Sequence, residues 1–203
     1  MTQPIVGILV GGQGRRMGGV AKGLLRYQGQ PLLDRLVDAC RRAVAPAELR
    51  RVCLIGNAAA YGATRLPVLA DEPPGLGPIG GLRALLLDAA RSGHDAIALA
   101  VDLPYVTPGL IRRLCVEQAG AAALAPRETD LLWQPLFARY RPEPVLRAID
   151  AVLDARRSSL QSIFEVLASG ADRAVELALT SDERATLRDW DRPNDMEAPA
   201  REP

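Results

Sequence analysis

The sequence predicts an α/β domain in which helices cover both faces of a mostly parallel sheet. Three observations support this prediction: short apolar stretches recur along the chain, segments with helical apolar spacing separate them, and the apolar stretches lack polar alternation. Strands that are apolar on both faces are typical of a parallel sheet buried on both sides. The 203 residues are enough for one substantial core. We therefore expect a single-domain, three-layer αβα sandwich with a Rossmann-like, mostly parallel sheet.

The first half of the chain supplies four of the expected strands and three of the expected helices. The strands lie at residues 5–10, 52–55, 66–70 and 96–101. The helices lie at residues 31–44, 79–91 and 108–117. A long glycine-rich loop, residues 11–29, separates the first strand from the first helix. In parallel α/β sheets, binding sites form beyond the carboxyl ends of the strands, which is where such loops lie.

The second half is expected to complete the same domain. Strands are predicted at residues 121–125 and 133–140, the second of them a candidate antiparallel strand, followed by helices at 143–155 and 159–168. Two short late strands are expected at 173–177 and 187–190. The last residues are rich in proline, alanine and charge, so we expect a domain over residues 1–196 and a flexible tail over residues 197–203.

Composition excludes several classes of function. The net charge of +1 gives no reason to expect nucleic acid or a membrane surface as a partner. No apolar run approaches the ~18 residues that span a bilayer, and no basic leader precedes the first apolar stretch. The three cysteines are odd in number and widely spaced, which favours a reducing cytoplasm over a disulfide framework.

The loop after the first strand has the composition of a phosphate-binding loop. Its glycines allow backbone N–H groups to approach an anion, and Arg15, Arg16 and Lys22 add positive charge. It is not a P-loop, because Lys22 is preceded by Ala21 and followed by Gly23, and it does not contain G-x-G-x-x-G. The alternative is a surface loop with solvated basic residues. The buried strand before the loop favours phosphate binding.

The lysine content of the chain points to the same loop. Of 25 basic residues, Lys22 is the single lysine and all the others are arginines. A lysine ammonium is a compact point charge, whereas an arginine guanidinium is a planar fork, so the two are not interchangeable at a phosphate site. Retention of one lysine within a glycine-rich loop indicates a specific role for it.

Two aspartates follow predicted strands and are further candidates. Asp102 comes directly after the fourth strand, where a carboxylate can hold Mg²⁺ against phosphate oxygens; alternatively it caps a turn or the next helix. Asp71 precedes a glycine-rich entry to a helix, which can approach a ligand or can be a tightly packed connecting turn. The single histidine, His94, precedes a strand and is expected in an exposed turn. Trp133 and Trp190 are expected in the core or at a subunit contact.

With these residues in hand, the chain resembles the molybdenum cofactor guanylyltransferases, within the wider family of glycine-loop nucleotidyltransferases. Residues 9–12, Leu-Val-Gly-Gly, resemble the L-A-G-G opening of the family, and residues 16–23 resemble its R-M-G-G-x-D-K-G. Further resemblances follow in order: G-x-P-L at residues 29–32, D…G-P-L-x-G at 71–82, C-D-x-P at 101–104 and N-T-P-E-D/E at 191–195.

The resemblance implies roles for particular residues. The residues implied in nucleotide binding are Leu9, Val10, Gly11, Gly12, Lys22, Asn57, Asp71 and Asp102. Within this set, Lys22 would bind phosphate, Asp71 and Asn57 the nucleoside, and Asp102 the Mg²⁺. Arg16, Lys22 and Asp102 would be the catalytic residues.

The implied reaction is transfer of GMP from GTP to the terminal phosphate of molybdopterin, with release of pyrophosphate. Cofactor-accepting enzymes or their chaperones would be partners. The alternatives are a cytidylyltransferase for the same cofactor, a sugar-1-phosphate nucleotidyltransferase, and a nucleotide-binding module without turnover. The chain departs from the family pattern at Ala21 (family acidic residue), at Gln134 (family His), and at Asp189 and Asp191 (often Asn), where negative charge would lie near an anionic acceptor.

Overall fold

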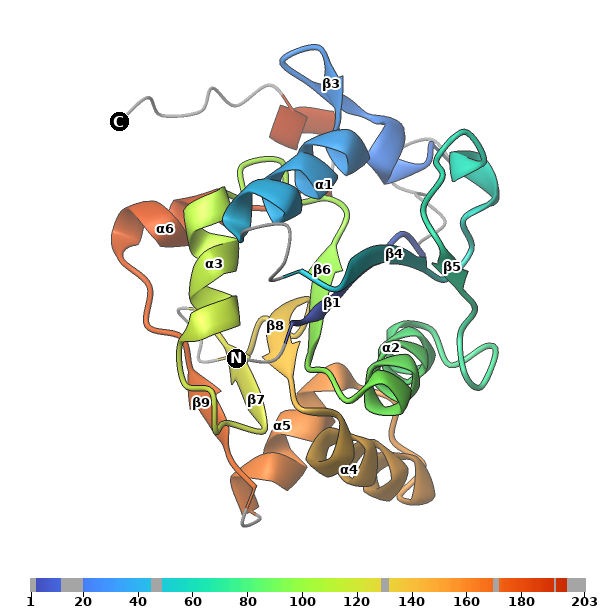
Figure 1. Ribbon diagram of the computed structural model, residues 1–203, viewed down its shortest axis with the longest axis vertical. Helices are drawn as coiled ribbons and strands as arrows, with labels where there is room; N and C mark the ends of the chain where they lie inside the picture. Colours follow the sequence, from blue (N-terminus) through green and yellow to red (C-terminus); the bar gives the residue numbers. More distant parts are fainter. Residues whose placement is uncertain are drawn as a thin grey trace.

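A seven-stranded sheet forms the middle layer of the computed structural model, which describes residues 3–11, 20–44, 49–128, 132–169, 172–191 and 193–196 (Figure 1). The strand order is β5-β4-β1-β6-β8-β7-β9. The strands are β1 (Ile5–Leu9), β4 (Arg51–Ile55), β5 (Val68–Leu69), β6 (Ala96–Ala100), β7 (Ala123–Ala125), β8 (Phe137–Tyr140) and β9 (Ala174–Glu176). The helices are α1 (Leu32–Ala43), α2 (Pro78–Ser92), α3 (Pro108–Val116), α4 (Pro142–Asp154), α5 (Leu160–Ser169) and α6 (Ser181–Thr186).

All strand pairs in this sheet are parallel except the two made by β8. β8 runs antiparallel to β6 on one side and to β7 on the other, whereas β7 pairs with β9 in parallel. The carboxyl ends of the other six strands therefore lie along one edge of the sheet, and β8 begins at that edge. The prediction of a mostly parallel sheet is confirmed, as is the antiparallel strand within residues 133–140.

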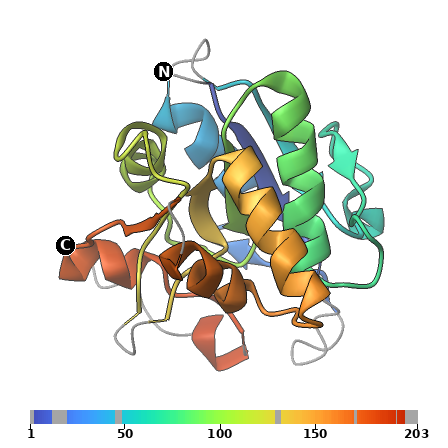
Figure 2. The ribbon, with the colours of Figure 1, turned by 90° about the horizontal axis from the view of Figure 1, so that it is seen from below.

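Helices cover both faces of the sheet, as the apolar strands predicted. Successive side chains of a strand point to opposite faces. On β1, Val6 and Ile8 pack in the apolar cluster that contains α1 and α3, and Ile5 and Leu9 pack in the cluster that contains α2, α4 and α5. Figure 2 shows α2 and α4 side by side on the second face. The three-layer prediction is confirmed.

Local sequence signals explain where several helices begin and end. Pro78, Pro108 and Pro142 stand in the first turns of α2, α3 and α4, where the missing N–H of proline has no intrahelical partner to lose. Gly93 ends α2 in the left-handed conformation, with a φ of 69°. None of the helices in the described ranges has both the length and the apolar character needed to cross a bilayer.

The structure differs from the sequence prediction in three short segments. The predicted loop 11–29 contains the short 3₁₀ helix η2 (Lys22–Leu24) and the strand β2 (Arg26–Tyr27), which forms an antiparallel hairpin with β3 (Gln30–Pro31) just beyond the loop. The hairpin turns at Gln28 and Gly29, which both have positive φ, as two-residue hairpin turns require.

The other two differences lie near the C-terminus. The unpredicted helix α6 begins with a capping box formed by Thr180 and Glu183. The strand predicted at 187–190 is wrong. Leu187 and Trp190 are buried, but they are three residues apart, and the Trp190 N–H donates to the Asp102 carbonyl (3.1 Å) instead of to a neighbouring strand.

Candidate functional site

The sheet edge that carries the candidate site contains a topological switch point. β1 lies between β4 and β6, and in register Leu9 lies opposite Ile55 on one side and Ala100 on the other. The chain leaves β1 through α1 toward β4, whereas β6 is on the opposite side. Such a point opens a crevice beyond the strand ends, which is where α/β sheets bind ligands. Val10 and Gly11 leave β1 at this crevice; the predicted site residues Gly12 and Arg16 lie outside the described residues.

Glycine backbone and one carboxylate lie together where β1 and β4 end. A Cβ added at Gly56, whose φ is +95°, would lie 3.5 Å from the Cα and N atoms of Gly11 and 3.5 Å from Asp71 Oδ1. A Cβ added at Gly81 would lie 3.3 Å from the same oxygen. The structure therefore brings Asp71 close to Gly11, as a shared nucleoside and phosphate site requires.

Asn57 and the glycine-rich entry to α2 have local structural roles. Asn57 is exposed, and its Oδ1 accepts a hydrogen bond from the Ala59 N–H (3.1 Å), which forms a turn after β4. The start of α2 is tightly packed: a Cβ at Gly80 would lie 2.7 Å from the Pro73 carbonyl oxygen, and one at Gly81 2.9 Å from Ile55 Cγ2, whereas a Cβ at Gly75 or Gly77 would meet nothing within 4 Å. Tight packing is thus confirmed at Gly80 and Gly81.

Gly23 holds Lys22 at the sheet edge. The Gly23 N–H donates to the Tyr61 hydroxyl (3.1 Å), and a Cβ at Gly23 would lie 2.8 Å from both Tyr61 Cε1 and Val101 Cγ2. These contacts leave room only for glycine. They dock the end of the loop against η3 (Ala59–Tyr61) and the residue before Asp102. The backbone of Lys22 is thus fixed next to the carboxyl end of β6.

The side chain of Lys22 bridges two aspartates that are far apart in the sequence. Its Nζ lies 2.7 Å from Asp102 Oδ2 and 2.5 Å from Asp191 Oδ1. Burial opposes charge on this ammonium, but hydrogen bonds to Asp102 and Asp191 outweigh it, so the pKa of Lys22 is raised above its ordinary value. Lys22 is therefore charged throughout the physiological range, and the structure places it in direct contact with Asp102.

Asp102 belongs to a group of three aspartates that we call the carboxylate cluster: Asp102, Asp189 and Asp191. Each offers one carboxylate oxygen, and these oxygens lie within 4.8 Å of one another. Loss of solvent around the carboxyl group raises the pKa of Asp189, and repulsion from Asp102 and Asp191 adds to the effect. Carboxylate oxygens are the ligands that hard divalent cations prefer. The donor set therefore fits such a cation, whereas the sequence prediction had assigned only Asp102 to the metal.

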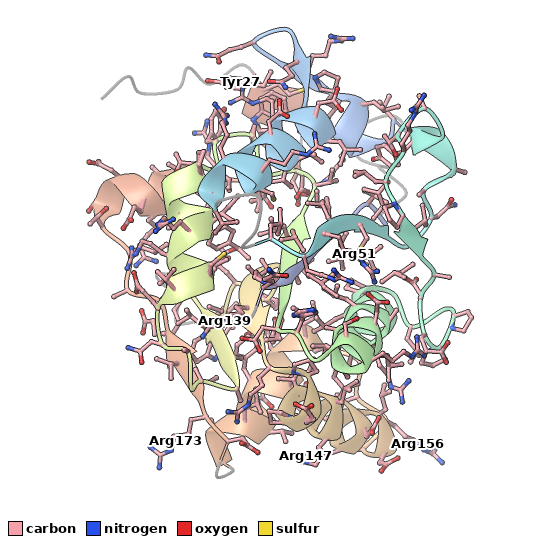
Figure 3. The ribbon with its side chains drawn as sticks, in the orientation of Figure 1. Tyr27, Arg51, Arg139, Arg147, Arg156 and Arg173 are labelled. Carbon is pink, nitrogen blue, oxygen red and sulfur yellow. The ribbon has the colours of Figure 1, made fainter. Side chains whose placement is uncertain are left out.

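Three aromatic rings hold the segments of this site together. Tyr27, labelled in Figure 3, contacts Tyr105 and Trp190 edge to face, with ring centroids 5.1 and 5.8 Å apart. Trp190 donates from Nε1 to the Tyr105 hydroxyl (3.2 Å) and is only 1% exposed. These rings join the β2–β3 hairpin, the loop after Asp102 and the Asp189–Asp191 segment. The expectation that Trp190 belongs to the core is confirmed.

A small cavity lies further along the same edge, where β7 and β9 end and β8 begins. Its volume is 180 Å³, and its lining residues are Pro126, Arg127, Glu128, Gln134, Leu179, Arg184 and Leu187. The Gln134 amide donates to Glu128 Oε1 (2.9 Å). Leu187 is two residues from Asp189, so their Cα atoms are at most ~7 Å apart. The cavity is thus within reach of the carboxylate cluster.

His94 lies away from this edge. It precedes the amino end of β6, whereas the carboxylate cluster lies beyond the carboxyl end of the same strand. Burial raises the pKa of the Cys40 and Cys53 thiols to about 12, so neither is a thiolate nucleophile. Among the described residues, the charged groups at the site are accordingly the three carboxylates of the cluster, the Asp71 carboxylate and the Lys22 ammonium.

A family model described as "MobA-like NTP transferase domain" matches residues 6–174. The chain belongs to this family. The match runs from β1 to the start of β9 and includes the crevice, Lys22 and Asp102. Asp189 and Asp191 lie beyond its end.

Named relatives agree with the family. The chain is 33% identical over 195 residues to the "Probable molybdenum cofactor guanylyltransferase" of Opitutus terrae, covering 94% of this chain and 91% of that one. It is 40% identical over 119 residues to the "Molybdenum cofactor guanylyltransferase" of Cereibacter sphaeroides, covering 58% of this chain. The chain spans only 60% of the length of the latter relative.

Solved structures share the fold of this MobA-like domain. Molybdopterin-guanine dinucleotide biosynthesis protein A from Archaeoglobus fulgidus matches with a TM-score of 0.69 and 22% identity, over 95% of each chain. The protein Rv0371c from Mycobacterium tuberculosis, solved in complex with manganese, matches with a TM-score of 0.58 and 21% identity, over 92% of this chain and 98% of that one. The single-domain nucleotidyltransferase fold predicted from the sequence is confirmed.

Proposed function

We propose that this protein transfers GMP from GTP to the terminal phosphate of molybdopterin, forming the guanine dinucleotide cofactor and releasing pyrophosphate. The observation that carries the proposal is the meeting of Lys22 with the carboxylate cluster at the switch point, next to a crevice lined by glycine backbone and Asp71. Membership of the MobA-like family and the names of the relatives support the choice of donor and acceptor.

The reaction is an in-line displacement at the α-phosphorus of GTP. A terminal phosphate oxygen of the acceptor forms a bond to that phosphorus, the bond from the α-phosphorus to the bridging oxygen breaks, and pyrophosphate leaves with the electron pair. The attacking phosphate is already anionic, so no strong general base is required. The position of His94 at the opposite edge agrees with this. Catalysis then depends on positioning and on neutralising charge.

The nucleotide is held mainly by the first part of the crevice. Backbone groups of Leu9, Val10 and Gly11, continuing into Gly12, approach guanine and the phosphates, because glycines leave the backbone accessible. Asp71 contacts the nucleoside, with Asn57 at its side. Lys22 and Arg16 bind phosphate oxygens. The roles of Gly12 and Arg16 rest on the sequence alone.

The carboxylate cluster would hold Mg²⁺, with Asp102 as a ligand and Asp189 and Asp191 as additional ones. When bound there, Mg²⁺ neutralises phosphate charge and makes the α-phosphorus more electrophilic. The three carboxylates supply the oxygen ligands that this ion prefers, and the manganese complex of Rv0371c shows that a structural relative binds a divalent ion.

The acceptor is expected on the β7–β9 side of the carboxylate cluster. Its phosphate must reach the α-phosphorus of GTP, and the cavity of about 180 Å³ lined by Arg127 and Arg184 lies on this side. We further propose that the reaction takes place in the cytoplasm and that the product passes to cofactor-accepting enzymes or their chaperones.

A nucleotide panel followed by a turnover assay tests the proposal. GTP should raise the thermal unfolding midpoint more than CTP or UTP, because a ligand that binds only the folded state stabilises it. Pyrophosphate release should then require GTP, Mg²⁺ and molybdopterin together. A preference for CTP would indicate a cytidylyltransferase. Turnover with a sugar 1-phosphate as acceptor would indicate a sugar-1-phosphate nucleotidyltransferase. GTP binding without pyrophosphate release would indicate a binding module.

A further inference from the structure

The functions proposed for Lys22 and for the carboxylate cluster compete for the same oxygen atoms. Lys22 is assigned to the triphosphate, yet its Nζ lies 2.7 Å from Asp102 Oδ2 and 2.5 Å from Asp191 Oδ1. Both aspartates are also assigned to a divalent cation. A cation coordinated by these carboxylates, at oxygen distances of about 2.0–2.6 Å, would be in close contact with the ammonium, and like charges repel.

We propose that the Lys22 ammonium is the resident counter-ion of the carboxylate cluster and exchanges with the divalent cation. Lys22 leaves the aspartates when a divalent cation takes them, and its ammonium is then available to the triphosphate. The inference rests on the proposed function, because that function supplies the need for both the cation and the triphosphate. It predicts that cation binding and triphosphate binding favour each other.

The construction of the loop suits such an exchange. The backbone is fixed just after Lys22 by the Gly23 contacts with Tyr61 and Val101, so the exchange moves only the side chain. A lysine has a flexible four-carbon stem and a compact charge, which allows the ammonium to fit between two carboxylates and to turn away. The Lys22 side chain is 20% exposed, so its ammonium is not enclosed by protein on every side. An arginine fork would pair with one carboxylate in a fixed geometry. This accounts for a lysine here in a chain whose other basic residues are arginines.

The single lysine makes a direct experiment possible. Protein labelled with ¹³C and ¹⁵N in lysine only gives one side-chain ammonium signal, from Lys22. Without divalent cation, the Nζ and Cε signals should report a hydrogen-bonded ammonium. Titration with Mg²⁺ in the absence of nucleotide should shift them toward the values of a solvated lysine, over the concentration range in which calorimetry detects Mg²⁺ binding. Lysine signals that stay unchanged while Mg²⁺ binds would overturn the proposal.

A matched pair of variants tests the same exchange from the side of the metal. Lys22→Gln removes the ammonium at nearly constant size, and Arg83→Gln removes the same charge on α2, where Arg83 pairs with Asp150 (3.4 Å). Measured by electron paramagnetic resonance without nucleotide, the Mn²⁺ affinity of Lys22→Gln should rise about tenfold or more, and that of Arg83→Gln should remain at the wild-type value. Equal or weaker Mn²⁺ binding by Lys22→Gln, or no binding by either protein, would overturn the proposal.

Failure of this inference can be told apart from failure of the proposed function. Guanylyl transfer by a protein whose Lys22 signals do not respond to Mg²⁺ would remove the exchange and leave the reaction. Displacement of Lys22 by Mg²⁺ in a protein that releases no pyrophosphate from GTP would support the exchange and reject the proposed reaction.

Discussion

At the ends of β1 and β4 the candidate nucleotide site is lined by glycine backbone, whereas the carboxylate cluster next to it is made of side chains from distant segments. In the first region, Gly56 and Gly81 lie against Asp71, and Gly56 lies against the backbone of Gly11. In the second, Lys22 joins Asp102, 80 residues away, and Asp191, 169 residues away. The first region depends on the absence of side chains and the second on their exact mutual placement.

Under the proposed function, this difference separates the binding of the nucleotide from the chemistry done on it. Backbone N–H groups can hold phosphates with little dependence on neighbouring side chains, since the strand ends already fix the backbone. Charge neutralisation instead requires groups that lie within hydrogen-bonding distance of one another. Substitutions in the two regions should therefore have effects of different kinds.

The largest effect is expected at Lys22 and Asp102. Lys22→Ala and Asp102→Ala should each lower turnover by at least ~10², because each removes a charge placed at the reacting phosphates. Pyrophosphate release under saturating GTP and Mg²⁺ measures this. Asp150→Ala, which removes an exposed carboxylate on α4, is the control and should retain wild-type turnover. Wild-type rates in both site variants would contradict the assignment.

Alanine substitutions at two glycines should have different effects, one on the free energy of unfolding and the other on GTP affinity. Gly23→Ala should cost about 1–3 kcal/mol, since its Cβ would lie 2.8 Å from Tyr61 and Val101. Gly11→Ala meets nothing within 4 Å, so it should leave the free energy of unfolding nearly unchanged and weaken GTP binding. Urea unfolding and GTP titration of both variants give the comparison. Equal destabilisation by the two substitutions would show that the backbone contacts are not as described.

Loss of the Tyr105 hydroxyl should lower the affinity of the carboxylate cluster for a divalent cation. Tyr105→Phe leaves the indole N–H of Trp190 without its acceptor, at a cost of about 1–2 kcal/mol. Because Trp190 is hydrogen-bonded to the Asp102 backbone, Mn²⁺ affinity should fall in this variant while GTP affinity without metal is retained. Tyr27→Phe keeps the ring contacts and serves as the control. A fall in GTP affinity alone would assign the aromatic rings to the nucleotide side.

The smallest effect is expected at the start of α6. Thr180→Ala removes the capping box and should cost about 1 kcal/mol in urea unfolding.

The hydrogen bond from the Thr180 backbone, followed by pairing with Arg113, lowers the pKa of Glu183 below its ordinary value of 4.5. The stability that Glu183 contributes is therefore present above pH 4.5 and is lost as the pH falls through the lowered pKa. In Glu183→Gln the free energy of unfolding should no longer fall over this pH range. If it falls as in the wild type, Glu183 contributes little to stability.

The sequence predicted the sheet and the residues at its strand ends better than it predicted the carboxylate cluster. Apolar strands and glycines are local signals, and Asp102 could be placed because it directly follows a strand. The positions of Asp189 and Asp191 depend on Trp190 packing against Tyr27 and Tyr105, which is a tertiary contact that no local pattern encodes. A signal was nonetheless present, since the family resemblance placed the negative charge of Asp189 and Asp191 near the acceptor.

The erroneous strand at 187–190 has the same cause. Burial of Leu187 and Trp190 follows the apolar pattern, but the backbone partner of Trp190 is the loop after β6 and not a strand. The hairpin of β2 and β3 was missed because its strands are two residues long and carry no apolar alternation. The limits of the domain at residue 196 and the tail beyond it remain predictions.

The burial of Trp190 also gives the molecule an optical reporter. The chain has two tryptophans, and Trp190 is hydrogen-bonded through its backbone to the residue that begins the carboxylate cluster. A Trp133→Phe variant would confine indole fluorescence to that one buried ring. Its emission would then follow, in real time and without any added dye, each displacement of the Asp102 loop as ligands enter and leave.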